Sequence, residues 1–212
     1  MKKSNIHNPK QKHTIKYIIP IGTLCHIAYL FKRNNLKLTS YPFDWIFSNL
    51  HNVIHALKDD FKTFLDKSKY INIESKKCGH IIYHPQMFNH HNPLMNEPDY
   101  DYFVRCINRL KRTIKAPELK LVAVIFTNFI DNITTTFTDY IIKMNHKLKK
   151  HITNYRLLCI VHYSNRPTNH YHLTTHKNID FLEISTISIS NGVEFVHPPD
   201  NDYLDKLIND IY

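Results

Sequence analysis

The chain has 212 residues, of which 42% are hydrophobic and 22% are charged, and its formal net charge is +10 at pH 7. This balance provides enough apolar material for a folded core and excludes a wholly disordered chain. The length fits one domain, and four cysteines are too few for a small scaffold held together by disulfides. We therefore expect reduced thiols and a cytoplasmic protein.

Residues 1–14 are basic and polar, and we expect them to form a disordered tail in front of a single domain over residues 15–212. The tail is not followed by the apolar segment of a signal peptide. The apolar run over residues 17–30 is too short to span a bilayer and is interrupted by a histidine. We expect no contact with a membrane.

The first element of the domain is a strand, a tight turn and a helix. The segment KYIIPIG, residues 16–22, predicts a buried strand that ends at Gly22. Thr23 is a candidate N-cap for a helix from Leu24 to about Asn34, in which the apolar residues have helical spacing.

The next segment alternates between helical and extended patterns. Apolar residues at helical spacing over 50–57 and 61–65 predict two helices, or one helix with a break, capped by Asp44 or Ser48. Residues 70–84 predict a hairpin or paired strands. Residues 85–99 contain three prolines and predict a long loop, of the kind that often carries function.

The rest of the chain predicts an α/β fold. Helical patterns occur at 99–114, 137–152 and 203–211, and near-continuous apolar runs lie between them. We expect a three-layer structure, with a mixed, mostly parallel sheet and helices on both of its faces. The strands expected in this sheet are residues 17–21, 120–126, 156–162 and about 179–184.

Cys25 is the candidate nucleophile. It follows the strand and the turn, so it should lie in the first turn of the helix, where free N–H groups and the helix dipole favour an anion. In such a position the pKa of a thiol can fall from about 8.5 to roughly 3.5–7.5, which produces a thiolate at neutral pH. The alternative is a buried, inert cysteine that packs the helix.

A nucleophilic cysteine needs a histidine base, and the base needs a group to orient it. The segment FNHHN places His90 and His91 in the long loop, and Asp44 lies on a bend beside Trp45, the only tryptophan. Asp44 could orient the base. The alternatives are solvated surface histidines and an aspartate that only caps a helix.

The segment from Ile21 to Leu65 resembles the opening of the family called putative papain-like cysteine peptidases, which occurs in bacteria and large DNA viruses. The matching residues are Gly22, Cys25, Ala28, Pro42, Phe43, Asp44, Trp45, Asp60 and Phe61. Looser similarity continues in Phe88, His90 and His91, and at the end of the chain in Gly192, Phe195, Asp200 and Asp202. The chain departs from the family where an arginine usually follows the buried strand, because Thr127 and Asn128 follow Phe126 here.

The resemblance implies a cysteine-dependent hydrolase or transferase that needs no cofactor and acts on a protein or peptide. Cys25 would be the nucleophile, His90 or His91 the base and Asp44 a catalytic partner. Gly22, Thr23 and Trp45 would contribute to substrate binding. Pro42, Phe43 and Trp45 should then be buried beside the Cys25 helix. Localisation would be the host cytoplasm or the virion if the source is a virus.

Two other classes of function fit the composition. Cys78, His80 and His84 share one face of a predicted strand, and His90 or His91 could complete a tetrahedral metal site, although the spacing matches no standard zinc motif. A basic surface rich in Tyr and Phe could instead bind nucleic acid or a host protein without catalysis. Nucleic acid is the less favoured partner because the basic residues are scattered along the chain.

Overall fold

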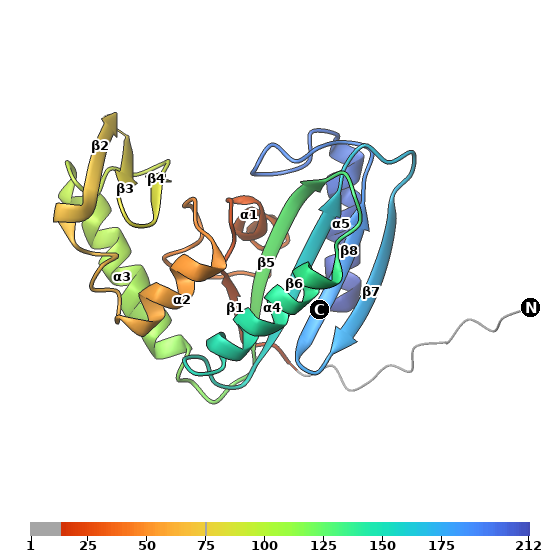
Figure 1. The fold of residues 1–212 in the computed structure, drawn as a ribbon, viewed down its shortest axis with the longest axis horizontal. Helices are drawn as coiled ribbons and strands as arrows, with labels where there is room; N and C mark the ends of the chain where they lie inside the picture. Colours follow the sequence, from red (N-terminus) through yellow and green to blue (C-terminus); the bar gives the residue numbers. More distant parts are fainter. Residues whose placement is uncertain (1–13, 75) are drawn as a thin grey trace, which may run out of the picture.

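The computed structural model describes residues 14–74 and 76–212, so the tail expected at 1–14 lies outside it except for its last residue. The larger of the two described sheets has five strands in the order β1-β5-β6-β8-β7 and occupies one half of the molecule (Figure 1). Four strands are parallel, and β7 pairs antiparallel with β8 at the edge. Its strands are β1 (Tyr17–Pro20), β5 (Lys120–Phe129), β6 (Tyr155–Tyr163), β7 (His170–His176) and β8 (Ile179–Ser185).

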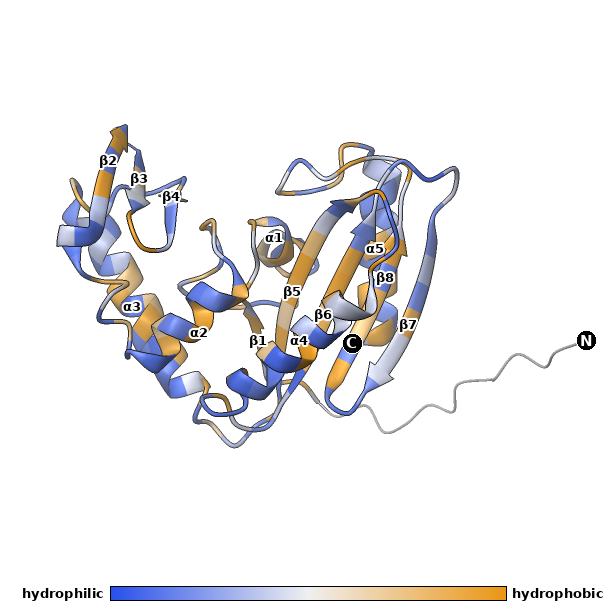
Figure 2. Ribbon diagram, viewed as in Figure 1, coloured by the Kyte–Doolittle hydropathy of each residue, from blue (hydrophilic) through white to orange (hydrophobic). Residues whose placement is uncertain are grey.

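Helices cover both faces of this sheet, because its central strands are apolar on both sides (Figure 2). One face packs against α1 (His26–Arg33) and α5 (Pro198–Ile211). The other packs against α2 (Leu50–Lys58) and α4 (Thr135–Leu148). The predicted three-layer α/β fold and its parallel strands are confirmed. Within the described ranges, no helix is both long and apolar enough to cross a bilayer.

A second, antiparallel sheet lies to one side and leads into the loop that contains His90 and His91 (Figure 1). Its strands are β2 (Tyr70–Glu74), β3 (Lys77–His80) and β4 (His84–Phe88), in that order. The paired strands expected at 70–84 are confirmed. The long loop expected at 85–99 is shorter than predicted, because β4 continues to Phe88 and α3 (Glu97–Thr113) begins at Glu97.

The second helix expected around 61–65 is absent from the described chain. Residues 59–65 form turns, and Asp60 and Phe61 have φ angles of 56° and 63°, which a right-handed helix does not allow. The helical spacing of the phenylalanines has another cause: Phe64 packs in an aromatic cluster, 5.7 Å from Phe88 and 5.8 Å from Phe103 between ring centroids. The apolar spacing of residues 61–65 therefore reflects packing in the core and does not indicate a helix.

Gly79 fixes the approach of β3 to β4, and we expect Gly79→Ala to be strongly destabilising. A Cβ at this position would lie 2.1 Å from the carbonyl oxygen of Pro85, which is backbone and cannot rotate away. Overpacking of this kind costs about 1–3 kcal/mol or more. Denaturant unfolding should show this loss, whereas Gln86→Ala, at an exposed position of β4, should stay within about 0.5 kcal/mol of wild type. Equal stability of the two variants would contradict this account.

Candidate active site

Cys25 lies at the junction of β1 and α1, at the carboxyl end of the strand. It is the N-cap residue of α1, with φ −68° and ψ −18°, and only 3% of its surface is exposed. The helix begins at His26, two residues later than predicted, and the predicted N-cap role of Thr23 is wrong. The Thr23 hydroxyl donates instead to the carbonyl of Ile125 (3.1 Å), which ties the turn to β5.

The turn before Cys25 requires a glycine for a steric reason. A Cβ on Gly22 would lie 2.5 Å from Cγ2 of Ile27 and 2.8 Å from the carbonyl oxygen of Leu24. Gly22 therefore lets the strand and the start of the helix approach closely. The position supports the backbone around the thiol, and its predicted contact with substrate stays a prediction.

His90 is brought to Cys25 from the loop that follows β4. Its Nε2 lies 3.8 Å from the Sγ of Cys25, although the two residues are 65 positions apart in the sequence. This separation is within reach of a hydrogen bond to sulfur, and nucleophile–base pairs are often loose before substrate binds. His90 is exposed while Cys25 is buried, so solvent reaches the histidine of the pair more readily than the cysteine.

His91 contacts α3 and anchors the loop to this helix. Its Nδ1 lies 3.0 Å from a carboxylate oxygen of Asp99, and its ring stacks on Tyr102 at 4.8 Å. The other carboxylate oxygen of Asp99 accepts from the backbone N–H of Asn92 (2.8 Å). Of the two candidate histidines, the structure places only His90 against the thiol.

Residues 42–45, with the sequence PFDW, lie beside α1, as the resemblance implied. Pro42 and Phe43 are buried, and Trp45 is half-buried, with Nζ of Lys32 from α1 5.5 Å from its ring centroid. Trp45 is thus less covered than expected. The fully buried Asp44 accepts from the backbone N–H of Tyr41 (2.8 Å) and forms an ion pair with Nζ of Lys37 (2.5 Å).

Asp44 therefore neither caps α2 nor forms a hydrogen bond with His90 in the described structure. The N-cap of α2 is Asn49, whose side chain accepts from the N–H of Asn52 (2.9 Å), so the predicted capping by Asp44 or Ser48 is wrong. The second carboxylate oxygen of Asp44 is buried and has no hydrogen-bond partner among the described residues. Nδ1 of His90 likewise forms no hydrogen bond with them.

The electrostatics of Cys25 differ from the predicted thiolate. Burial raises the pKa of its thiol to about 11, the negative charge of Asp44 adds to the increase, and only its own backbone N–H lowers the pKa. The position at a helix terminus favours a lower pKa, but burial and the nearby carboxylate, which the sequence does not reveal, raise it. The resting site is a neutral thiol beside an imidazole, so a thiolate must be generated by proton transfer.

Removing the charge of Asp44 should lower the pKa of Cys25. Burial also raises the pKa of Asp44, to about 6, but the carboxyl is still mostly ionised at pH 7.5 beside Lys37. We expect Asp44→Asn to shift the midpoint of Cys25 alkylation by iodoacetamide to lower pH, as followed by peptide mass spectrometry across a pH series. Asp66→Asn, which changes a half-buried carboxylate that is hydrogen-bonded to Ser68, should leave the midpoint in place. An unchanged midpoint in Asp44→Asn would contradict the electrostatic account.

A buried polar network lies behind Cys25 and involves residues that the sequence analysis did not single out for function. Nδ1 of His26 lies 2.8 Å from Oγ of Ser190, which also accepts from the N–H of Gly192 (3.1 Å). Asn128 exchanges two hydrogen bonds with the backbone of Ser190. The ring of Phe195 packs edge-on against His26 at 4.8 Å. The C-terminal Gly-x-x-Phe element therefore supports the start of α1.

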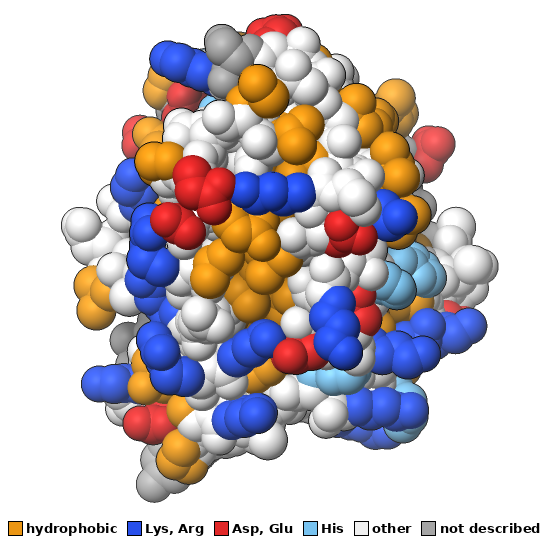
Figure 3. All heavy atoms as spheres, turned by 90° about the vertical axis from the view of Figure 1, so that its left-hand side faces the viewer, with side chains coloured by type: hydrophobic (Ala, Val, Ile, Leu, Met, Phe, Trp, Pro, Cys, Tyr) orange, Lys and Arg blue, Asp and Glu red, His pale blue; other side chains and the backbone are white. Residues whose placement is uncertain are grey.

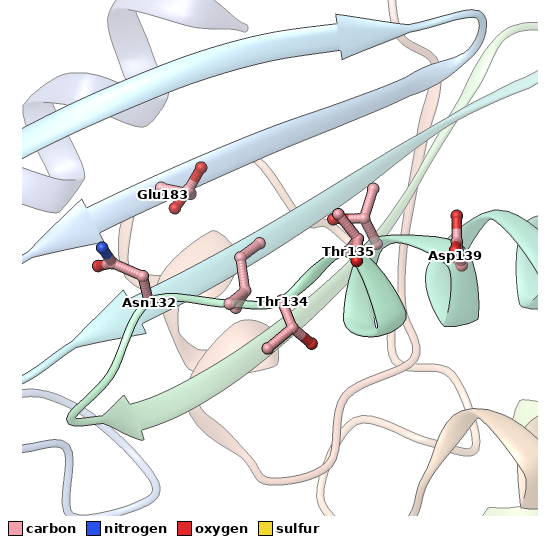
Figure 4. A pocket seen from close by; sticks show the side chains of 7 residues that line it. Asn132, Thr134, Thr135, Asp139 and Glu183 are labelled. Carbon is pink, nitrogen blue, oxygen red and sulfur yellow. The ribbon is translucent and has the colours of Figure 1, made fainter.

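Two cavities among the described residues bear on the choice of a binding site. One, of about 440 Å³, lies at the start of α4 (Figure 4) and shares no residue with the Cys25 site. It is lined by Asn132, Ile133, Thr134, Thr135, Thr138, Asp139 and Glu183. The other, of about 290 Å³, is lined by Thr23, Leu24, Phe47, Ser48, His84 and Gln86. The smaller cavity is the relevant one, because Thr23 and Leu24 directly precede Cys25 in the chain.

The alternative metal site is not formed. The described ranges contain no group of three or more His, Cys, Asp or Glu side chains placed to hold an ion. Nε2 of His80 contacts the carbonyl of Thr63 (3.0 Å), and Nδ1 of His84 accepts from the N–H of Gln86 (3.1 Å). Nδ1 of His80 also accepts from the N–H of Ile82 (3.1 Å), so both ring nitrogens of His80 and one of His84 are engaged locally.

One face of the surface gives the binding-module alternative no added support (Figure 3). On this face, Lys and Arg side chains are interspersed with acidic and hydrophobic groups. Binding of nucleic acid or of a host protein stays a prediction.

Comparison with known proteins agrees with the resemblance. The chain is 32% identical over 65 residues to the protein named "Uncharacterized protein R408" of Acanthamoeba polyphaga mimivirus, and this covers 30% of the chain and 29% of that relative's length. No solved structure matches the chain. The model of the family described as "Putative papain-like cysteine peptidase (DUF1796)" matches residues 16–165, which include Cys25 and His90. The chain belongs to this family of putative papain-like cysteine peptidases.

Proposed function

We propose that the protein is a cysteine-dependent acyl hydrolase, with Cys25 as the nucleophile and His90 as the general base. The observation that carries this proposal is the 3.8 Å separation between Sγ of Cys25 and Nε2 of His90. Membership of the peptidase family supports it and suggests a peptide or another acyl compound as substrate.

The raised pKa of Cys25 determines how the nucleophile would form. Because burial favours the neutral thiol, the proton moves to Nε2 of His90 as the sulfur–carbon bond forms. The carbonyl π electrons move to oxygen and generate an oxyanion. Backbone N–H groups in the first turn of α1 have no acceptor within the helix and could stabilise that charge, at about 2.7–4 kcal/mol per donor.

The second half of the cycle returns the proton. When the tetrahedral intermediate collapses, the leaving group departs with the proton held by His90, and a thioester on Cys25 remains. Water then attacks the thioester, His90 accepts a proton from that water, and the carboxylic acid and the free thiol are released. The role requires an unprotonated Nε2 on His90 before substrate binds.

The test is to trap the acyl-enzyme with p-nitrophenyl acetate. We expect release of p-nitrophenolate and an acetyl thioester found by peptide mass spectrometry at Cys25 and removed by hydroxylamine. Acetylation of Cys78, Cys106 or Cys159 at the same rate would show general thiol reactivity and refute the proposal, as would the absence of any acyl group on Cys25.

A further inference from the structure

The 290 Å³ cavity and the Cys25–His90 pair lie along the same two pieces of chain. Thr23 and Leu24 form one wall and lead directly to Cys25. His84 and Gln86 of β4 form the opposite wall, and the chain runs on from β4 to His90. Cys25 and His90 do not themselves line the cavity, so it adjoins the pair through these two pieces of chain and could take a group next to a bond under attack.

Backbone hydrogen bonds hold the two walls together. The N–H of Ser48 donates to the carbonyl of Thr23 (3.3 Å), and the N–H of Phe47 donates to the carbonyl of Met87 (2.9 Å). The segment with Phe47 and Ser48 thus bridges the turn before Cys25 and strand β4. A cavity held in this way is formed before any ligand arrives, as is usual for small-molecule sites.

The lining carries no formal charge apart from a histidine. None of the six lining residues is Asp, Glu, Lys or Arg, and burial lowers the pKa of His84, which favours its neutral form. Because Nδ1 of His84 accepts from the N–H of Gln86 (3.1 Å), the neutral ring carries its hydrogen on Nε2 and presents a donor there. A charged ligand group would lose its hydration here without meeting an opposite charge.

Hydrogen-bonding capacity remains within this uncharged lining. The hydroxyl of Ser48 has only a long contact of 3.5 Å with the carbonyl of Asn49. The side-chain amide of Gln86 makes no hydrogen bond with the described part of the chain and can both donate and accept. Leu24 and Phe47 supply apolar surface between these groups.

The volume limits the ligand to a small group. A cavity of about 290 Å³ lies just below the range of about 300–1,000 Å³ that is usual for ligand sites. It suits one side chain with a few methylene groups and a polar end.

We propose that this cavity is a substrate subsite for an uncharged side chain that ends in a carboxamide, such as glutamine, on the residue next to the reacting carbonyl. The inference rests on the proposed function. The methylene groups of such a side chain would contact Leu24 and Phe47. Its amide would meet the donors and acceptors of Ser48, His84 and Gln86.

The test uses four N-acetyl-aminoacyl chloromethyl ketones, with Gln, Met, Glu or Lys side chains. In each case the sulfur–carbon bond of the adduct forms at Cys25, chloride leaves and the thiol proton passes through His90 to solvent. We expect the Gln probe to alkylate Cys25 at least about tenfold faster than the Glu and Lys probes, which corresponds to about 1.4 kcal/mol. Equal rates for the Gln, Glu and Lys probes would overturn the subsite.

A matched variant ties the preference to the cavity. We expect Gln86→Leu, which keeps the size of the side chain but removes its amide, to lower the ratio of the Gln to the Met rate several-fold. Thr138→Val, in the distant 440 Å³ cavity, should leave this ratio unchanged. A ratio that does not respond to Gln86→Leu would contradict the proposed contacts.

A binding experiment separates failure of the subsite from failure of the proposed function. In the Cys25→Ala protein, N-acetylglutamine methylamide at millimolar concentration should shift the NMR signals of the Thr23, Leu24 and Ser48 amides. N-acetylglutamate methylamide should shift them less. If these shifts occur but the wild type is not alkylated, the subsite stands and Cys25 is not the nucleophile. If Cys25 is alkylated but the shifts and the probe preference are absent, Cys25 is reactive and the cavity is not the subsite.

Discussion

Replacing Cys25 by alanine should lower turnover of an acyl substrate by about 10⁴- to 10⁶-fold, the loss seen when an enzyme loses the nucleophile of a catalytic unit. Cys25 supplies the sulfur that forms the covalent intermediate, and the structure offers no substitute, because the other three cysteines are buried elsewhere in the core. Steady-state release of p-nitrophenolate, corrected for spontaneous hydrolysis, measures this effect.

A second cysteine variant separates chemistry from folding. Cys106 is as buried as Cys25 but lies on the inner face of α3, where Arg109 contacts its sulfur at 3.9 Å. Cys106→Ala should reduce stability and leave turnover within about threefold of wild type. Substantial turnover in folded Cys25→Ala, or its loss in folded Cys106→Ala, is incompatible with Cys25 as the nucleophile.

Replacing His90 by alanine should reduce the rate of acylation by about 10²- to 10⁴-fold, the usual contribution of a general base. The effect is large because burial holds the pKa of the Cys25 thiol near 11, so few molecules ionise unaided at neutral pH. Single-turnover acylation by p-nitrophenyl acetate isolates this step. Because His90 is exposed, added imidazole should reach the vacated space and restore part of the rate.

His91 provides the matched control, since it is the adjacent residue with the same side chain. Its contacts with Asp99 and Tyr102 assign it to the anchoring of the loop. His91→Ala should therefore lower thermal stability and slow acylation by less than about tenfold, with no rescue by imidazole. A greater loss of acylation in His91→Ala than in His90→Ala would reverse the assignment of the base.

The sequence was sufficient to predict the main sheet because its strands are nearly continuous apolar runs. Strands β5, β6 and β8 are buried on both faces, and a strand buried in this way is a continuous apolar run that can be recognised in a single sequence. Strand β7 was missed for the opposite reason. Its seven residues, HYHLTTH, are mostly exposed at the sheet edge and contain three histidines, so no apolar period marks them.

The candidate site was predicted in part. Cys25 and the loop with His90 and His91 follow from motif and order along the chain, but the choice between the histidines depends on Asp99, which lies on α3 and contacts His91. The direction of the Cys25 pKa was also beyond the sequence. It depends on how deeply the thiol is buried and on the negative charge of Asp44, which lies 19 positions further along the chain.

The central claim is that Cys25 and His90 act as a nucleophile–base pair, and the pH dependence of Cys25 acylation tests it most directly. In the wild type, the rate should level off well below pH 11, because the proton passes to a histidine and not to hydroxide. In His90→Ala it should keep rising, about tenfold per pH unit, toward the pKa of about 11 that burial gives the isolated thiol. Profiles of the same shape in the two proteins would mean that His90 takes no proton from Cys25, and the account would be wrong.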